Sequence, residues 1–162
     1  MIRKATIKDI SRIAEILIFA KRSAYRNIFH DDASFTEMQV LPLALKYVNN
    51  PDLLDNIIVF DDEFVKGMAN TELCTSVDGL VAFHITEIYV DTFFQHLGIG
   101  KEMLLEIENQ CKCNGVSGIF LWVLEKNQQA IRFYEKHGFQ PTDERQLVEG
   151  TQEYEVKYAK RI

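Results

Sequence analysis

The hydrophobic positions of this chain follow two periods, one typical of helices and one typical of strands. Near the N-terminus, apolar residues at helical spacing predict one buried helix face, made of Ile10, Ile13, Leu17 and Ala20. Thr6 and Asp9 resemble a capping box that opens this helix, and Ser34 with Glu37 repeats the signal. Because Pro42 removes an amide donor, we expect two short helices in this second region and not one long one.

From Asn56 onward the pattern changes to strands. Runs rich in β-branched and aromatic residues predict strands at Asn56–Phe60, Phe64–Cys74, Leu80–Val90 and Gly118–Leu124, with shorter ones at Ile2–Ala5, Phe139–Thr142 and Glu153–Tyr158. Asp61–Glu63 and Ser76–Gly79 are typical of hairpin turns. A further helix is expected over Asn127–His137, ended by Gly138. No repeat or linker interrupts this order, so residues 1–162 are predicted to form a single mixed α/β (α+β) domain.

The stretch Tyr89–Lys101 joins a strand to a helix through Gly98 and Gly100. Apolar residues at helical spacing predict the buried face of that helix: Ile99, Met103, Leu104, Ile107 and Cys111. The first turn of a helix has free N–H groups and a partial positive charge, so it attracts an anion, usually a phosphate. Glycine lets a ligand come close to the main chain there. The alternative is a glycine pair that only turns a strand into a helix.

Two common phosphate motifs do not fit this stretch. A P-loop requires a glycine where Gln95 stands and a Ser or Thr where Glu102 stands. The dinucleotide fingerprint requires a third glycine where Met103 stands. The sequence therefore predicts a phosphate site without nucleotide–metal chemistry.

Composition and charge narrow the class of protein. The chain has 162 residues, of which 47% are hydrophobic and 26% charged, as is ordinary for a soluble globular domain. It shows no apolar run of membrane length and no signal-peptide pattern. Its three cysteines lack metal-ligand spacing, and we interpret them as reduced thiols of a cytoplasmic protein without a bound metal. The net charge of −6 argues against a nucleic-acid surface.

Two motifs in the second half of the chain resemble one known family. Gln95–Gly100 matches the Q/R-x-x-G-x-G/A loop of the GNAT N-acetyltransferase superfamily, and Asn127–Phe139 looks like its second signature, N-x-x-A-x-x-F-Y-x-x-x-G-F. The motifs occur in the family's order, with a helix and a buried strand between them. The resemblance covers Leu80 to about Phe139, while the first half of the chain matches only in layout.

The resemblance implies a fold and a cosubstrate. The fold would be a mixed, mostly antiparallel central sheet flanked by helices, splayed between Leu80–Val90 and Gly118–Leu124, with acetyl-CoA in the splay. The backbone of three strand residues would hold the pantetheine arm: Ile88, Tyr89 and Val90. The pyrophosphate would lie on the loop and helix start, at Gln95, His96, Leu97, Gly98, Ile99, Gly100 and Lys101. Asn127 would contact the pantetheine arm, and Lys136 would contact a phosphate of the adenosine part.

Transfer to an amine also requires a base and a proton donor. An alkylammonium has a pKa of about 10.4, so the acceptor must lose a proton before it attacks a thioester. Glu87 is the candidate base, because strand alternation places it in an apolar row with Phe83, Ile85 and Tyr89. The alternatives are a salt-bridged strand glutamate and a water relay. Tyr134 fills the family's tyrosine position and is the candidate donor to the leaving thiolate.

The sequence indicates only the chemical class of the amine that would accept the acetyl group. Asp31, Asp32 and Glu87 are acidic and favour a cationic amine, which could be a polyamine, another small amine or a protein N-terminus. For Asp31 and Asp32 a solvated loop is the alternative, and for His84 a structural role is expected. A non-catalytic acyl-CoA-binding module is the alternative function, and the resemblance leaves a homodimer open.

Overall fold

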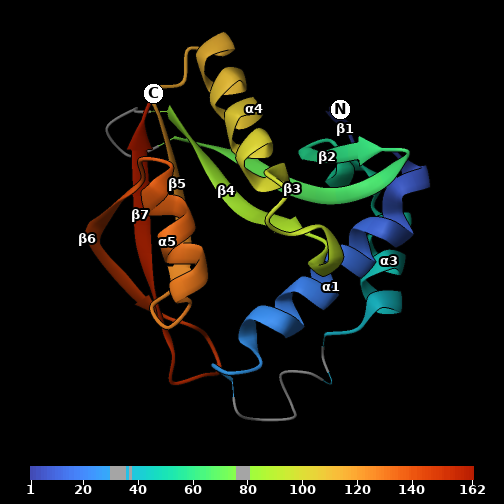
Figure 1. Cartoon of the computed structure of the whole chain (residues 1–162), viewed down its shortest axis with the longest axis horizontal. Coiled ribbons are helices and arrows are strands. Elements are labelled where there is room, and N and C mark those ends of the chain that lie inside the picture. The colour runs from blue at the N-terminus through green and yellow to red at the C-terminus, as the bar shows by residue number, and fades with distance from the viewer. Residues whose placement is uncertain (30–35, 37, 76–80) are drawn as a thin grey trace. The chain divides into compact units, whose positions relative to one another are not determined.

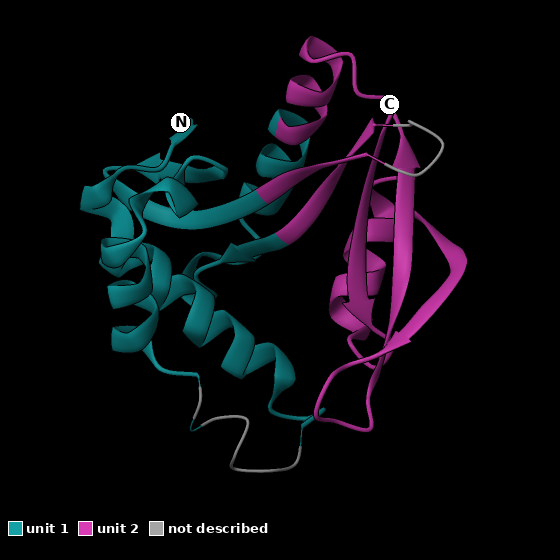
Figure 2. Ribbon diagram, turned by 180° about the vertical axis from the view of Figure 1, so that it is seen from behind, with its two compact units in different colours: residues 1–70, 87–106 teal, residues 71–86, 107–162 magenta. Residues whose placement is uncertain are grey.

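A computed structural model describes residues 1–29, 36, 38–75 and 81–162 of the chain. These residues form two compact units (Figure 2). Unit 1 consists of Met1–Asn70 and Glu87–Glu106, and unit 2 of Thr71–Thr86 and Ile107–Ile162. The expectations for Asp31 and Asp32, for Ser34 with Glu37, and for the turn Ser76–Gly79 lie outside the described residues.

The described strands belong to one sheet with the order β1-β2-β3-β4-β5-β7-β6. Their bounds are β1 Ile2–Lys4, β2 Ile57–Asp62, β3 Phe64–Thr75, β4 Val81–Val90, β5 Gly118–Leu124, β6 Gln140–Leu147 and β7 Tyr154–Arg161 (Figure 1). The pairs β1–β2, β2–β3, β5–β7 and β6–β7 are antiparallel, and the pair β4–β5 is parallel. The expected mixed, mostly antiparallel sheet is confirmed.

Unit 1 is built on the helix that the N-terminal periodicity predicts. This helix, α1, spans Ile10–Tyr25 and follows a short 3-10 turn, η1, at Ile7–Asp9. Its predicted apolar face is buried, with 6% of Ile10, 0% of Ile13, 3% of Leu17 and 5% of Ala20 exposed. Ile10, Ile13 and Leu17 join a core cluster with residues from α3 (Val40–Asn49), the 3-10 turn η2 (Pro51–Leu54), β2 and β3. Burial of this stripe holds α1 in place.

Pro42 does not break the helix that contains it, in contrast to the prediction. It lies inside α3, in the first turn, and does not separate two helices. The first backbone hydrogen bond at this end runs from the N–H of Leu43 to the carbonyl of Gln39, at 3.4 Å. The amide that proline lacks would have had no partner within the helix, so Pro42 is tolerated there.

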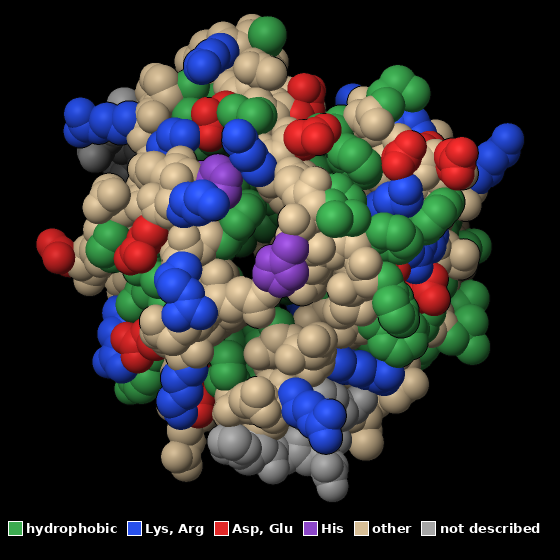
Figure 3. Space-filling view, in the orientation of Figure 1, with side chains coloured by type: hydrophobic (Ala, Val, Ile, Leu, Met, Phe, Trp, Pro, Cys, Tyr) green, Lys and Arg blue, Asp and Glu red, His purple; other side chains and the backbone are tan. Residues whose placement is uncertain are grey.

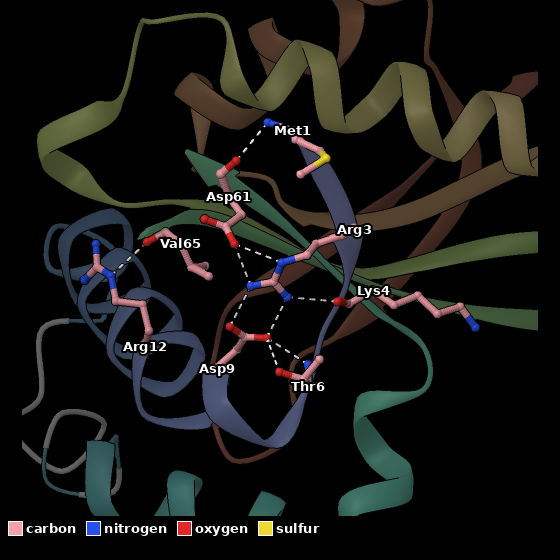
Figure 4. Close-up of polar contacts among 8 residues, drawn as sticks. All are labelled: Met1, Arg3, Lys4, Thr6, Asp9, Arg12, Asp61 and Val65. Atoms are coloured by element: carbon pink, nitrogen blue, oxygen red, sulfur yellow. Dashed lines mark hydrogen bonds and ion pairs between the residues drawn. The ribbon is translucent and has the colours of Figure 1, made fainter. Parts of the chain in front are cut away.

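An ion network ties the N-terminal strand of unit 1 to its neighbours (Figure 4). The guanidinium of Arg3 donates to both carboxylate oxygens of Asp9, at 2.8 and 2.9 Å, and to Asp61 Oδ2, at 2.7 and 2.9 Å. Asp9 Oδ2 also accepts from the N–H and the hydroxyl of Thr6, at 2.8 and 2.9 Å. Hydrogen bonding to Arg3 lowers the pKa of Asp9 from 3.8 to about 2.

We expect Asp9→Asn to lower the free energy of unfolding by roughly 2 kcal/mol at pH 7, because each pKa unit corresponds to about 1.4 kcal/mol. The folded-state pKa of Asp9 lies below its unfolded value, so this stabilisation is present above pH 4. It is lost as the pH falls from about 4 to 2. Urea unfolding of both proteins across this range measures the difference, which should shrink with acidification. Asp52→Asn, at an exposed site, is the control. A difference that stays constant down to pH 2 would contradict the assignment.

Unit 2 is organised around β5, which lies between β4 and β7. Alternate residues of β5 are buried, with 1% of Ile119, 1% of Leu121 and 5% of Val123 exposed. The parallel register pairs Ala82–Ile85 of β4 with Gly118–Leu121 of β5. The expected divergence of β4 and β5 stays a prediction.

Two other expectations for unit 2 concern His84 and the cysteines. His84 stacks on Phe120 with ring centroids 4.6 Å apart, and burial lowers its pKa. These contacts fit the structural role expected for it. Cys74, Cys111 and Cys113 are all free thiols. Burial, and next the charge of Glu108, raise the pKa of Cys111 to about 11, so this thiol stays protonated at neutral pH.

The helices and one face of the surface bear on the membrane and charge expectations. None of the helices in the described ranges is long and apolar enough to cross a membrane. On the face drawn in Figure 3, basic and acidic side chains are interspersed. The net negative charge therefore does not gather there into one acidic patch.

Candidate active site

The strand-to-helix connection predicted to bind a phosphate lies in unit 1. We call residues 91–98 the phosphate loop; it runs from the end of β4 to the start of α4, which spans Ile99–Cys113. It contains a 3-10 turn, η3, at Thr92–Phe94. His96 and Gly98 have φ values of 64° and 87°, in the left-handed region. A Cβ at Gly98 would meet no atom within 4 Å, so its conformation and not its packing requires glycine.

The start of α4 presents free amides. The first intrahelical bond runs from the N–H of Glu102 to the carbonyl of Gly98, at 3.1 Å. The N–H groups of Ile99, Gly100 and Lys101 therefore have no acceptor within the helix. His96, Leu97 and Gly98 just before them are exposed. Free amides beside a left-handed turn are the local geometry that binds anions in proteins, and the placement of the acetyl-CoA pyrophosphate on them stays a prediction.

A glycine that the sequence analysis did not single out brings α4 close to the sheet. A Cβ at Gly67 of β3 would lie 3.0 Å from Met103 Sδ, and 3.2 Å from both Ile99 Cγ2 and the carbonyl oxygen of Tyr89. A Cβ there would therefore require these neighbouring atoms to shift by a few tenths of an ångström. The signal in the sequence was a lone glycine inside a strand, which often marks a close backbone approach.

Glu87, the candidate base, lies in a cluster of polar side chains within unit 1. Its Oε1 forms an ion pair with Lys21 Nζ of α1 at 2.9 Å, and 18% of its side chain is exposed. Burial, and next the charge of Glu87, raise the pKa of Tyr47 to about 12. The Lys21 ammonium also lies 5.9 Å from the centroid of the Tyr89 ring, and the hydroxyls of Tyr89 and Tyr25 are 3.2 Å apart. The cluster therefore combines a carboxylate, an ammonium and three phenol hydroxyls.

The remaining candidates lie on or beside α5 (Gln128–Lys136) in unit 2. Asn127 caps this helix, because its Oδ1 accepts from the N–H of Ala130 at 3.2 Å. The Tyr134 ring packs edge-on against Phe133 and Phe139, with centroids 5.4 and 5.7 Å away. Because 0% of Phe139 is exposed, it anchors the tyrosine ring. Lys136 is exposed in the last turn.

The structure thus groups the candidates into two sets. Glu87, the strand end Ile88–Val90 and the residues 95–101 follow one another in unit 1. Tyr134 and Lys136 lie on α5 of unit 2, and Asn127 caps that helix. The contact between the two sets stays a prediction. Among the described residues, no group of three or more His, Cys, Asp or Glu side chains is placed to hold a metal ion.

Comparison with known proteins finds relatives both by sequence and by fold. A curated spermidine N(1)-acetyltransferase of Thermoplasma acidophilum is 24% identical over 149 residues, which cover 88% of this chain and 89% of that protein. A T. acidophilum PaiA N-acetyltransferase, solved in complex with coenzyme A, has a TM-score of 0.73 and 22% identity over 97% of this chain and 96% of that one. A ribosomal-protein-alanine N-acetyltransferase of Brucella melitensis has a TM-score of 0.74 and 15% identity over 100% and 99%.

The structural similarities establish the shared fold, and a match to a family model establishes the family of the chain. The model described as the Acetyltransferase (GNAT) family matches residues 19–139, which is more than half of the chain and contains both motifs. The chain therefore belongs to the acetyltransferase (GNAT) family and is an acetyl-CoA-dependent N-acetyltransferase.

Proposed function

We propose that this enzyme acetylates a primary amine by direct attack of the amine on the thioester. The observation that carries the proposal is the row of free amides at the start of α4, in a chain with both family motifs. Acetyl-CoA supplies the activated acetyl thioester. The amides of residues 95–101 bind its pyrophosphate, and the backbone of Ile88, Tyr89 and Val90 binds the pantetheine arm like an added strand.

Asn127 and Lys136 complete the cosubstrate site in this proposal. Since Asn127 Oδ1 caps α5, the side-chain group that remains for the pantetheine arm is the Nδ2 amide. The ammonium of Lys136 is exposed and would meet a phosphate of the adenosine part. We also propose that residues 1–162 act as one N-acetyltransferase domain, because the family model matches residues 19–139 and so includes parts of both units.

Glu87 serves as the base, directly or through water. Its ion pair with Lys21 occupies Oε1, which leaves Oε2 as the oxygen that accepts a proton from the acceptor ammonium. The backbone N–H near Val90 stabilises the developing oxyanion. Tyr134 donates its proton to the leaving sulfur, since its ring is held by Phe139 and its hydroxyl lies at the family's tyrosine position.

The acceptor is proposed as a class. A carboxylate among tyrosines favours an amine that arrives as a cation. The similarity to a spermidine N(1)-acetyltransferase supports a polyamine or another small amine. The fold shared with a ribosomal-protein-alanine N-acetyltransferase supports a protein or peptide N-terminus. Family membership favours catalysis over a non-catalytic acyl-CoA sensor.

The experiment is thermal unfolding with acetyl-CoA, CoA, ATP and NADH added separately. A ligand at 100 times its dissociation constant should raise the free energy of unfolding by about 2.7 kcal/mol, which is seen as a higher midpoint. We expect a shift with acetyl-CoA and CoA and none with the other two. Equal shifts with ATP would show a general phosphate site. No shift with acetyl-CoA would contradict the role of the phosphate loop.

A further inference from the structure

Asp91, where β4 passes into the phosphate loop, is bound from three directions. Its N–H donates to the carbonyl of Lys66 in β3 at 2.9 Å. Its Oδ1 accepts from the N–H of Phe93 at 2.8 Å, and its Oδ2 is ion-paired with Arg12 of α1. Only 11% of the Asp91 side chain is exposed. The first residue of the loop is therefore attached both to a strand and to a helix.

Arg12 is itself held by the elements around it. Its Nε donates to the carbonyl of Val65 in β3 at 2.8 Å (Figure 4). Its Nη1 pairs with Glu15 at 2.7 Å, and its Nη2 donates to Asp91. All three nitrogens of the guanidinium thus have partners. A side chain used in this way connects α1, β3 and the loop rigidly.

The aromatic residues beside Asp91 bind the loop to the same strand. The rings of Phe94 and Phe64 meet edge to face, with centroids 5.4 Å apart. The ammonium of Lys66 lies 4.9 Å from the Phe64 centroid and 5.2 Å from the Phe94 centroid. The loop is therefore packed on β3 as well as hydrogen-bonded to it.

We propose that Arg12 and Asp91 are positioning residues for the pyrophosphate of acetyl-CoA, a role that rests on the proposed function of the phosphate loop. Neither residue belongs to the sequence motifs. Free amides bind an anion well only when they already point to one place, because ordering them at the moment of binding costs free energy. The Arg12–Asp91 pair supplies this order by holding the start of the loop, five residues before the left-handed turn at His96.

A charge-only explanation predicts a different sign. Asp91 is negative and lies near the bound phosphates in sequence, so simple electrostatics would make Asp91→Asn bind acetyl-CoA more tightly. Positioning predicts weaker binding, because the neutral amide loses the ion pair with Arg12 while it can still accept from Phe93. The direction of this one change therefore distinguishes the two explanations.

The test compares two acetyl donors in steady-state kinetics of the full chain. Acetyl-CoA carries the pyrophosphate, whereas acetyl-pantetheine carries the same thioester and arm without phosphates. We expect Arg12→Gln and Asp91→Asn each to raise KM for acetyl-CoA about tenfold, a difference of about 1.4 kcal/mol. KM for acetyl-pantetheine should stay within about twofold, and the double variant should lose little more than either single one.

Glu15→Gln is the matched control, because it removes the other ion pair of Arg12 and leaves Asp91 unchanged; it should alter KM for acetyl-CoA less than about twofold. If Arg12→Gln does not fold, Asp91→Asn decides the question alone. Equal losses with both donors would show a general structural effect and overturn the proposal, as would an unchanged or lower KM for acetyl-CoA. A wild-type enzyme that uses both donors equally well would instead overturn the pyrophosphate assignment of the loop itself.

Discussion

Tyr134→Phe is expected to lower kcat by roughly 100-fold, because general acid catalysis by a positioned side chain contributes at least that factor. The change removes only the hydroxyl. The ring keeps its edge-on packing against the buried Phe139, so the fold and the cosubstrate site should be retained. The dissociation constant of CoA, measured by titration calorimetry, should therefore stay within about twofold of the wild-type value.

Tyr158→Phe is the matched control for this prediction. Tyr158 is a second tyrosine of unit 2, and its hydroxyl donates to Glu135 at 3.2 Å. Removal of this hydroxyl should change the free energy of unfolding but leave kcat nearly unchanged. If Tyr134→Phe left turnover unchanged, Tyr134 would be removed from the mechanism and the leaving thiolate would take its proton from water.

Glu87→Gln should lower kcat/KM for the amine by roughly 100-fold near neutral pH, where the acceptor is almost fully protonated. The loss should be largest at the acidic end of the pH profile. It should shrink toward alkaline pH, because the amine, with a pKa of about 10.4, then loses its proton without help. The measurement is kcat/KM from about pH 6 to pH 9.5 for both proteins.

The ion pair with Lys21 provides the comparison that separates two roles of Glu87. Lys21→Met breaks the pair but keeps the carboxylate. If Glu87 is only a salt-bridged strand residue, both changes should have the same effect. If it is the base, Lys21→Met should retain far more activity than Glu87→Gln. A Glu87→Gln profile parallel to that of the wild type would support a water relay.

Several local features of the candidate site were predictable because neighbouring residues determine them. The buried stripe of α1 follows from its helical spacing, and the strand Gly118–Leu124 is observed with the predicted bounds. The residues around Gly98 form a strand-to-helix turn with free amides, as their glycines and periodicity predict. Each of these depends on backbone preferences and on hydrophobic patterns within about one element.

Other features could not be read from neighbouring residues. Pro42 was expected to break a helix, but it is accommodated in the first turn, where its missing donor has no consequence. The strand β6 extends beyond Thr142, because its pairing with β7 continues to Leu147 through polar residues whose composition does not predict a strand. The strand β7 extends beyond Tyr158, because its pairing with β5 continues to Arg161. Propensity is a weak guide where ladder hydrogen bonds determine the length of an edge strand.

The sequence by itself determined the two motifs, and with them the family and the acetyl donor, because each motif is a short run whose geometry is local. The residues that bind the donor stay a prediction from the same motifs. Only the tertiary structure decided which distant side chains surround that run. Lys21 reaches Glu87 across 66 positions, and Arg12 reaches Asp91 across 79. Such pairs form because burial of the apolar face of α1 brings the helix against the sheet, and no periodicity in the chain encodes which polar residues then meet.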